Sequence, residues 1–557
     1  EFFMSTESLY DAVKRHAQLT PKAPALRYMG RTLSYRTLLT EIDRFAGVLA
    51  GLGVKRDTVV TVSLPNIPQG IIAFYAINAL GGIAHLVHPL APAPQLKAYT
   101  ETAGSELLIL LDGGASGRPA LPTAGTVILC APAAYLPPLK AGLFRLINRK
   151  NRPKPPDGPN VYRYETLMKR AARAAARPFP PPEKPETATA VYLHSGGTGG
   201  LPKTVELSAR AINALCREGP DILEVPSCRG LSMLSVLPMF HGFGLAMGVH
   251  AMLLNGGSNA IMPKFRTGAA IKHIKKGQAN YMIGVPAMYE ALLKSPKFYG
   301  KGLRRLKICF VGGDFVSKSL LDRFNRRLAE AGSACRLFEG YGLTETVTVC
   351  AVNKPSRHRA GSVGRPLRGM EIRAFSADGV PLPPGEAGEL CVSGAALMNG
   401  YLDSPAETAA AFFEYEGRPF VRTGDLGHTD GAGYVFFKSR LKRLVKVSGI
   451  PVFPSEVERL ASDAYPAVRD VCAVDVPDEK TDNKLVLFLT LKPEERAALT
   501  DEKLNAFREE LKALIESRLS VYARPKEIII LDKLPQTPVG KIDSRTLQKE
   551  YAEHEVL

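Results

Sequence analysis

Helix-like and strand-like patterns alternate along the first part of this chain, and that alternation restricts its fold more than any other feature. Apolar residues recur at the helical period over 36–52 and 69–80, whereas short β-branched runs occupy 58–63 and 83–87. Strands that alternate with helices are typical of a parallel sheet covered by helices on both faces. The sequence therefore predicts an α/β fold built on doubly wound sheets.

The pattern changes farther along, which predicts more than one domain in a chain of 557 residues. A proline-rich passage at 177–185 separates the first alternating unit from a second one. Frequent glycine and proline with short alternating strands over 361–434 indicate a small β-rich subdomain. We expect a large N-terminal domain over 1–439, with subdomains at about 1–180, 187–350 and 351–439, and a small C-terminal α+β domain over 443–557.

A glycine-rich loop follows a strand-like run at 191–193 and reads L-H-S-G-G-T-G-G-L-P-K-T-V over 193–205. Glycine lets the backbone approach an anion, while hydroxyls and a lysine add donors and positive charge. The residues expected to hold nucleotide phosphates are Ser195, Gly196, Gly197, Thr198, Gly199, Gly200 and Lys203. The alternative is a flexible turn without a ligand. The P-loop spacing G-x-x-x-x-G-K-[ST] is absent, because Leu201 and Pro202 separate Gly200 from Lys203.

Charge and cysteine content limit the partners and the cellular compartment that we expect for this protein. The formal net charge is +18, yet no nucleic-acid-binding motif accompanies it, so a nucleic-acid partner is not expected. The eight cysteines form no C-x-x-C pair, which argues against zinc and disulfides and favours a reducing compartment. Since no basic-then-apolar leader is visible, we expect a cytoplasmic protein.

Two segments raise the question of a membrane. The uncharged stretch 70–92 is long enough to span a bilayer, but Asn78, the glycine pair 81–82 and two histidines favour a buried helix and strand. The segment 140–154 combines apolar residues on one side of an expected helix with basic residues beside it. It predicts peripheral contact with an anionic membrane, at the inner membrane face. The alternative is an ordinary amphipathic surface helix.

Five further motifs follow the glycine-rich loop in order. They read L-P-M-F-H-G-F-G-L at 237–245, E-G-Y-G-L-T-E-T at 339–346, V-R-T-G-D-L-G at 421–427, K-S-R-L-K-R at 438–443 and L-P-Q-T-P-V-G-K-I-D at 534–543. With the loop, they resemble the adenylate-forming superfamily of acyl-CoA synthetases, peptide-synthetase adenylation domains and luciferases, from about Leu33 to Leu547. The resemblance implies that a carboxylate attacks the α-phosphorus of ATP, giving acyl-adenylate and pyrophosphate. A thiol, usually that of coenzyme A, then displaces AMP.

The resemblance implies roles in nucleotide binding. Glu345 would hold Mg²⁺, which prefers hard oxygen ligands, and Thr344 would donate to the α-phosphate. Tyr341 would stack on adenine, and Asp425 would accept hydrogen bonds from both ribose hydroxyls. The other residues expected around ATP and AMP are Gly313, Asp314, Glu339, Gly340, Gly342 and Arg440.

Further implied roles concern the small domain, whose rotation separates the two half-reactions in this superfamily. Lys541 would bridge the carboxylate and the α-phosphate during adenylation, and Gly449 would line the thiol channel afterwards. Arg440 would reach ribose and phosphate from the domain junction, and Lys442 would be the pivot of a hinge at 440–442. The chain departs from the family pattern at Gly199, Thr204, Ser439 and Arg443.

His241 matches the aromatic residue or histidine that gates the carboxylate pocket in the superfamily. The implied catalytic set is His241, Thr344, Glu345, Arg440 and Lys541. The walls of the acyl pocket are expected from Phe240, His241, Phe243, Gly244, Met288 and Gly312. Because these walls are largely small or apolar, they favour an alkyl or aryl acid.

The leading hypothesis is an ATP-dependent acid:CoA ligase acting on a fatty or similarly apolar acid, with ATP, Mg²⁺ and coenzyme A as its small-molecule partners. A second hypothesis is a stand-alone adenylation enzyme that loads a carrier protein or activates an amino or aryl acid. The third is a non-catalytic sensor of nucleotide or acyl-adenylate. The sequence leaves open which acid is used and whether the protein is a monomer or a homodimer.

Overall fold

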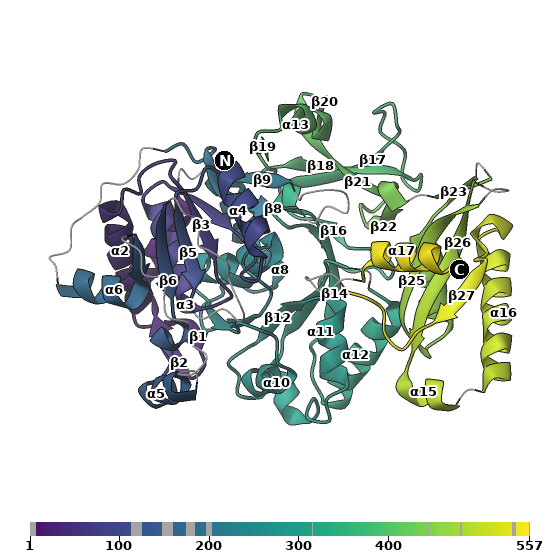
Figure 1. The fold of residues 1–557 in the computed structure, drawn as a ribbon, viewed down its shortest axis with the longest axis horizontal. Helices are drawn as coiled ribbons and strands as arrows, with labels where there is room; N and C mark the ends of the chain where they lie inside the picture. Colours follow the sequence, from purple (N-terminus) through teal and green to yellow (C-terminus); the bar gives the residue numbers. More distant parts are fainter. Residues whose placement is uncertain are drawn as a thin grey trace.

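The computed structural model describes residues 7–112, 125–147, 160–173, 184–195, 203–314, 316–443, 445–448, 450–478, 482–498, 500–536 and 542–555. Two large sheets with helices packed on them form most of the molecule, and a smaller unit in yellow and yellow-green lies at one end (Figure 1). This arrangement confirms the expected α/β fold class.

The first large sheet has eight strands in the order β19-β9-β8-β4-β3-β5-β6-β7. Neighbouring strands from β8 to β7 are parallel, whereas β9 and β19 are antiparallel additions at one edge. The strands are β3 Val59–Ser63, β4 Ile83–Leu86, β5 Leu107–Leu111, β6 Thr126–Cys130, β7 Val161–Arg163, β8 Thr189–His194, β9 Thr204–Ser208 and β19 Gly400–Tyr401.

The second large sheet has nine strands in the order β16-β15-β14-β13-β12-β10-β11-β1-β2. It is parallel in the middle and antiparallel at both ends. The strands are β1 Pro24–Tyr28, β2 Arg31–Ser34, β10 Ser232–Ser235, β11 Ser258–Ile261, β12 Tyr281–Gly284, β13 Ile308–Val311, β14 Leu337–Gly342, β15 Val349–Val352 and β16 Arg365–Pro366.

The two sheets exchange strands across the subdomain limits expected near residue 180. Strand β1, from the N-terminal unit, pairs with β11 in the second sheet. Strand β8, from the next unit, pairs with β4 in the first sheet. Strand pairing joins segments that are distant in sequence, so a proline-rich passage does not by itself divide one sheet from the other.

Helices cover both sheets. They are α1 Leu9–Leu19, α2 Tyr35–Gly51, α3 Pro68–Ala79, α4 Ala93–Thr102, α5 Pro138–Ile147, α6 Tyr164–Arg173, α7 Ala209–Arg217, α8 Gly219–Ile222, the π-helix η2 Phe243–His250, α9 Ala251–Leu254, α10 Thr267–Lys275, α11 Pro286–Leu293 and α12 Lys318–Glu330. Several begin at a serine whose side chain accepts from a first-turn N–H group, as Ser34, Ser208 and Ser317 do for α2, α7 and α12.

The uncharged stretch 70–92 contributes to buried helix α3 and strand β4, as the sequence predicts. Every residue of α3 and β4 is buried. Across the described ranges, no helix combines the length and the apolar character needed to cross a bilayer.

A third, antiparallel sheet carries one wall of the site described below. It contains β17 Met370–Phe375, β18 Gly388–Gly394, β20 Phe412–Tyr415, β21 Arg418–Thr429 and β22 Val435–Arg440, with helix α13 Pro405–Ala411 before β20. This sheet falls where the sequence predicts a β-rich subdomain.

The C-terminal part has hydrophobic clusters of its own, separate from the main core. Its elements are β23 Val445–Val447, β24 Ile450–Val452, α14 Pro454–Ala464, β25 Val468–Asp478, β26 Asp482–Leu491, α15 Pro493–Ala498, α16 Asp501–Arg518, β27 Glu527–Ile530 and α17 Ser544–Glu555. An independent core and the mixture of helices and strands fit the α+β domain that the sequence predicts here.

Candidate active site

One cleft of about 3110 Å³ gathers the predicted site residues from all three sheets and reaches the C-terminal domain. Lining it are Ser195, Lys203, Phe240, His241, Phe243, Gly244, Met288, Gly312, Gly313, Asp314, Glu339, Gly340, Tyr341, Gly342, Thr344, Glu345, Asp425, Arg440 and Lys442. Gly196, Gly197, Thr198, Gly199, Gly200, Gly449 and Lys541 lie outside the described residues.

The two ends of the glycine-rich loop are held together. The backbone N–H of Ser195 donates to the carbonyl of Lys203 over 2.9 Å, and the loop connects antiparallel strands β8 and β9. The ammonium of Lys203 lies 3.1 Å from the Glu407 carboxylate and 4.5 Å from the centre of the Tyr401 ring. The positive charge at this end of the loop is therefore balanced by protein groups.

Asp425 is the most enclosed acid of the cleft, with a side chain only 1% exposed. The hydroxyl of Tyr341 donates to Asp425 Oδ2 over 2.6 Å, and Arg440 Nε lies 3.0 Å from Oδ1. Strands β21 and β22 place Asp425 directly opposite Arg440 in register. Burial raises the pKa of Asp425, although the nearby Arg440 opposes that shift. The site thus holds a carboxylate in a largely dry wall, with a hydrogen bond to Oδ2 and an ion pair at Oδ1, which accepts no hydrogen bond from any described residue.

A strained turn presents Thr344 and Glu345. The 3₁₀ turn η4 Thr344–Thr346 is followed by Val347 at φ +63° and ψ −55°. The N–H of Thr348 donates to the carbonyl of Thr346 over 2.7 Å, which closes a γ-turn around Val347. A β-branched residue at positive φ costs roughly 1–3 kcal/mol, and such strain is concentrated at functional sites.

Close backbone approach at Gly342 supports this turn. A Cβ atom on Gly342 would lie 1.5 Å from the carbonyl oxygen of Thr348, so no larger residue fits there without movement. Gly342 belongs to the motif at 339–346, and the close approach of Thr348 explains why glycine occupies this position.

Tyr401 is a site residue that sequence reasoning missed. Its hydroxyl donates to Glu345 Oε1 over 2.9 Å, and its ring lies beneath the Lys203 ammonium. Strand β19 pairs Tyr401 with Val205, the last residue of the glycine-rich loop. Tyr401 therefore links Lys203 to Glu345, two residues that the motifs treat separately. No pattern around Tyr401 in the sequence indicates this contact.

Glu339 follows the two buried residues that begin β14 and lines the cleft. Burial raises the pKa of its carboxyl group to about 7. Near neutral pH the group is therefore present in both protonation states, and it is able to donate as well as accept a hydrogen bond.

A chain of hydrogen-bonding groups lies beside the glycine-rich loop. His85 Nε2 and His194 Nε2 are 2.9 Å apart, and His85 Nδ1 is 2.9 Å from the Thr61 hydroxyl. The His194 ring stacks on Tyr99 with centroids 3.9 Å apart. Since His194 directly precedes Ser195, this chain anchors the start of the loop in the core. In the sequence, these contacts are indicated only by the position of His194 directly before Ser195.

Buried neutral histidines should make the fold sensitive to acid. Burial, with smaller contributions from nearby charges, lowers the pKa of His85 and His250 to about 3 and that of His194 to about 4. In the unfolded chain these groups take up protons near pH 6.5, so stability is present above that value and is lost as the pH falls toward 4. Denaturant unfolding at pH 7 and pH 5 measures this loss.

His250→Gln is the matched test of that expectation. The His250 ring lies between the Tyr75 hydroxyl, 2.8 Å away, and Asn213 Oδ1, 2.9 Å away. Removing one such group should lessen the dependence of the unfolding free energy on pH by up to about 1.4 kcal/mol per pH unit. An unchanged slope in this variant would show that buried histidines do not cause the acid sensitivity.

The far part of the cleft is apolar. It is lined by Met233, Met247, Met252, Ile283, Met288 and Phe310. Gly244, at the start of η2, packs so closely that a Cβ atom would lie 2.1 Å from the carbonyl oxygen of Pro238. Phe240 and His241 also line the cleft, with ring centroids 4.7 Å apart. We call this apolar lining the apolar chamber; it belongs to the same cleft as the polar groups around Asp425.

The C-terminal domain contributes the remaining wall. Gln536 and Ile542, which flank the segment containing Lys541, both line the cleft. Arg443 forms a bidentate pair with Glu458 of α14, at 2.6 and 3.3 Å, and donates to the carbonyl of Ala473 over 3.1 Å. Arg443, one of the positions at which the chain departs from the family pattern, is thus held in place by Glu458 and Ala473.

The carboxylate oxygens of Glu345 are ligands of the kind that a hard divalent cation prefers. Mg²⁺ is usually held by one or two carboxylates together with waters and substrate phosphates. Among the described residues, no three His, Cys, Asp or Glu side chains come together as a self-sufficient metal site. Glu345, which opens onto the cleft, fits a cation that arrives with a polyphosphate.

The chain is similar to known proteins in both sequence and fold. Residues 13–402 match the family model described as AMP-binding enzyme, and residues 456–541 match the AMP-binding enzyme C-terminal domain. A long-chain-fatty-acid–CoA ligase of Bacillus subtilis (strain 168) is 28% identical and aligns over 100% of this chain and 96% of that protein. An indoleacetate–CoA ligase of Aromatoleum aromaticum is also 28% identical, over 96% of each.

A solved structure shares the fold. ATP-bound MatB from Rhodopseudomonas palustris has a TM-score of 0.80 and 21% identity, covering 98% of this chain and 100% of that one. The similarity extends over both the large and the small domain.

Proposed function

This chain belongs to the family of AMP-binding enzymes, and from that premise we propose that it activates a fatty or similarly apolar carboxylic acid. It is an acid:CoA ligase: a carboxylate and ATP give acyl-adenylate and pyrophosphate, and the thiol of coenzyme A then gives acyl-CoA and AMP. The relatives act on acids as different as long-chain fatty acids and indoleacetate, so the acid must be inferred from the cleft itself.

The proposal of an apolar acid as substrate rests on the apolar chamber. Four of its side chains are methionines, which adapt to irregular apolar ligands because their side chains are unbranched and flexible. Each methylene buried there would contribute about 0.8 kcal/mol. The carboxylate of such an acid would lie near His241, at the junction with the polar half of the cleft.

We assign the polar half to ATP. Asp425 would accept from the ribose hydroxyls, Arg440 would add positive charge, and Thr344 would donate to the α-phosphate. Lys203, once released from Glu407, would pair with the terminal phosphates. The remaining nucleotide contacts are those of the glycine-rich loop and of Gly313, Asp314, Glu339, Gly340, Tyr341 and Gly342.

Charge neutralisation is the central task of these residues. An acid anion and a nucleotide polyphosphate repel each other, so the site must offset that repulsion and align the attacking oxygen with the α-phosphorus. When bound, Mg²⁺ would be held by Glu345 and would withdraw charge from the phosphate oxygens. Tyr401 would orient the Glu345 carboxylate for that purpose.

Domain movement would then separate the two half-reactions. The boundaries that we propose are a large domain over 1–439, a hinge at 440–442 with Lys442 as pivot, and a small domain over 443–557. Arg443, fixed to Glu458, would turn with the small domain. Rotation would withdraw Lys541 after adenylation and bring Gly449 to the thiol channel.

A panel of acids tests the substrate class. We expect pyrophosphate release in the presence of coenzyme A to rise with alkyl chain length from C2 toward C18, by up to about fourfold in kcat/KM per methylene until the chamber is full. Preference for an amino acid, or thioester formation with a carrier protein but not with coenzyme A, would contradict the proposal. Pyrophosphate exchange with none of the acids would favour the nucleotide sensor.

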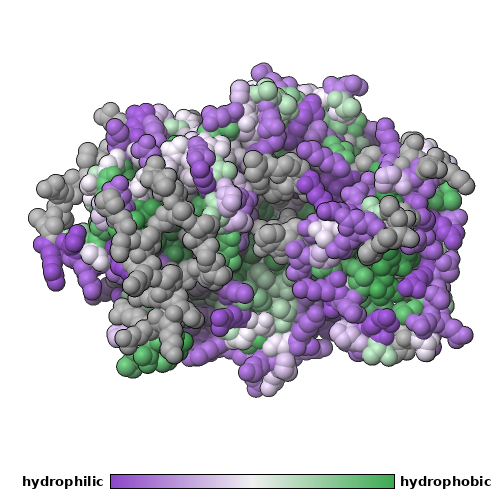
Figure 2. Space-filling model, in the orientation of Figure 1, coloured by the Kyte–Doolittle hydropathy of each residue, from purple (hydrophilic) through white to green (hydrophobic). Residues whose placement is uncertain are grey.

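Helix α5 supports peripheral contact with a membrane surface. Its apolar side faces solvent, with Leu139 91%, Leu143 58%, Leu146 67% and Ile147 67% exposed. Hydrophobic atoms, in green, are visible at the lower left of Figure 2, where Figure 1 places α5. An ordinary amphipathic surface helix would bury this side. Together with the basic residues of 140–154, the helix suits an anionic lipid surface, where apolar acids partition.

Vesicle sedimentation tests the role of α5. The double variant Leu143→Glu/Ile147→Glu should bind anionic vesicles at least about tenfold more weakly, because it removes apolar burial and adds negative charge. The matched control is Leu19→Glu/Val380→Glu, at positions that are 59% and 57% exposed elsewhere on the surface. Equal sedimentation of the wild type and both variants would exclude α5 as a membrane contact.

A further inference from the structure

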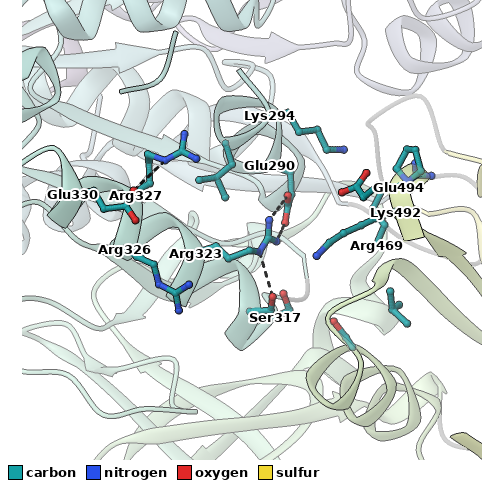
Figure 3. Close-up of a pocket in the computed structure, with 15 residues that line it drawn as sticks. Glu290, Lys294, Ser317, Arg323, Arg326, Arg327, Glu330, Arg469, Lys492 and Glu494 are labelled. Carbon is teal, nitrogen blue, oxygen red and sulfur yellow. Dashed lines mark hydrogen bonds and ion pairs between the residues drawn. The ribbon is translucent and has the colours of Figure 1, made fainter. Parts of the chain in front are cut away.

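A second cavity, of about 540 Å³, adjoins the cleft where the two domains face each other. Helices α11 and α12 of the large domain form one side, and residues of α14, β25 and α15 of the small domain form the other. Figure 3 shows the labelled side chains of Arg469, Lys492 and Glu494 opposite those of α11 and α12. No described residue of the motifs assigned to catalysis lines this cavity.

Positive charge predominates around the cavity and comes from both domains. Its cations are Lys294, Arg323, Arg326 and Arg327 of the large domain and Arg469 and Lys492 of the small domain. Among the described residues, the acidic side chains that line the same space are Glu290, Glu330 and Glu494. Positive side chains of the large domain and of the small domain repel each other when they face the same cavity.

Internal ion pairs leave part of this charge unbalanced. Arg323 is paired with Glu290 through two hydrogen bonds, and Arg327 Nε lies 3.7 Å from Glu330. Arg469 Nε lies 2.7 Å from Asp470. For Lys294, Arg326 and Lys492, no ion pair is formed with any described residue. The unbalanced cations come from both sides of the domain boundary.

We propose that this cavity binds a polyvalent phosphate anion that bridges the two domains. Its volume falls within the range of small-molecule sites and exceeds what one inorganic phosphate fills. Several ammonium and guanidinium groups converging on one space match the chemistry that recognises phosphate oxygens. Because each domain supplies cations, a bound anion would stabilise the observed domain arrangement and oppose rotation of the small domain.

This inference goes beyond the proposed function, since neither half-reaction requires a second anion site. Occupancy would slow the passage from adenylation to thioester formation, because rotation would separate Lys294 from Lys492. The cavity would therefore make turnover responsive to the concentration of polyphosphate anions.

Calorimetric titration with inorganic tripolyphosphate tests the site. The cleft is first saturated with a non-hydrolysable ATP analogue, and ionic strength is held constant because exposed charges are screened by salt. We expect the wild type to bind tripolyphosphate, and Lys294→Glu/Lys492→Glu to bind at least about tenfold more weakly. The neutral pair Lys294→Gln/Lys492→Gln should lie between them. Neither lysine has an ion pair with a described residue to lose, and unfolding temperatures of both pairs check that the fold is retained.

A control pair and a conformational readout complete the test. Lys97→Glu/Lys549→Glu carries the same charge change at residues that are 67% and 77% exposed outside the cavity. Tripolyphosphate should also increase energy transfer between fluorophores on the two domains in the wild type and in this control. Equal affinity in all variants, or an equal loss in the control pair, would refute the site. Failure of the ATP analogue to bind would count against the proposed function instead.

Discussion

Replacing Lys541 with alanine is expected to lower acid-dependent ATP–pyrophosphate exchange by about 10²–10³-fold, the range seen when one preorganised donor to developing charge is removed. Conversion of supplied acyl-adenylate to thioester should continue at a nearly normal rate. The reason for the difference is that Lys541 would neutralise charge between the carboxylate and the α-phosphate, which matters only in the first half-reaction. Separate assays of the two half-reactions measure both effects.

The structure makes this variant informative although Lys541 lies outside the described residues. Gln536 and Ile542, on either side of its segment, line the same cleft as Thr344 and Glu345. Lys549→Ala is a suitable control, because Lys549 lies on α17, is 77% exposed and does not line the cleft. Equal loss of both half-reactions in Lys541→Ala would contradict domain alternation.

The second large effect is expected at Asp425. Asp425→Ala should raise the KM for ATP by at least about 10²-fold, because a charged acceptor for two ribose hydroxyls is lost and each such bond contributes about 1.5–3 kcal/mol. Tyr341 and Arg440 would lose their shared partner as well. Asp425→Asn, which retains one acceptor oxygen, should have an intermediate KM. Initial rates over a range of ATP concentrations measure these changes.

The corresponding control is Asp378→Ala. Asp378 is an exposed acid in the same β-rich region, but it does not line the cleft. Its variant should keep the wild-type KM for ATP. Asp425→Ala with an unchanged KM and a normal unfolding temperature would show that ribose is bound elsewhere, and the nucleotide assignment would have to be withdrawn.

Local contacts within the cleft were partly predictable from the motifs. Asp425 and Arg440 belong to two of them, and the β21–β22 pairing explains why they meet. Tyr401 and Glu407 belong to none. Tyr401 reaches Glu345 across 56 residues, and His85 reaches His194 across 109. The periodicity of a single sequence indicates which residues share a face of one helix or strand. It does not predict contacts between residues that are far apart in the sequence.

Sheet topology shows the same limit on a larger scale. The alternation of patterns predicted the first helices and strands closely, as α2 and β3 illustrate. It did not indicate that β1 and β8 would each join the sheet of the other unit. The order of strands in a sheet depends on which strands pair in the folded protein. The alternation of helix and strand patterns does not specify that pairing.

The sequence by itself determined the α/β fold class, the order of the motifs and the kinds of group available for chemistry, because periodicity and residue type are local properties. Tertiary structure decided which groups became neutral, paired or exposed. Burial raises the pKa of Glu339 to about 7 and lowers that of His85 to about 3, while the apolar side of α5 stays in solvent. The physical reason is that solvation and charge–charge distance depend on how remote segments pack, and no short stretch of residues specifies either.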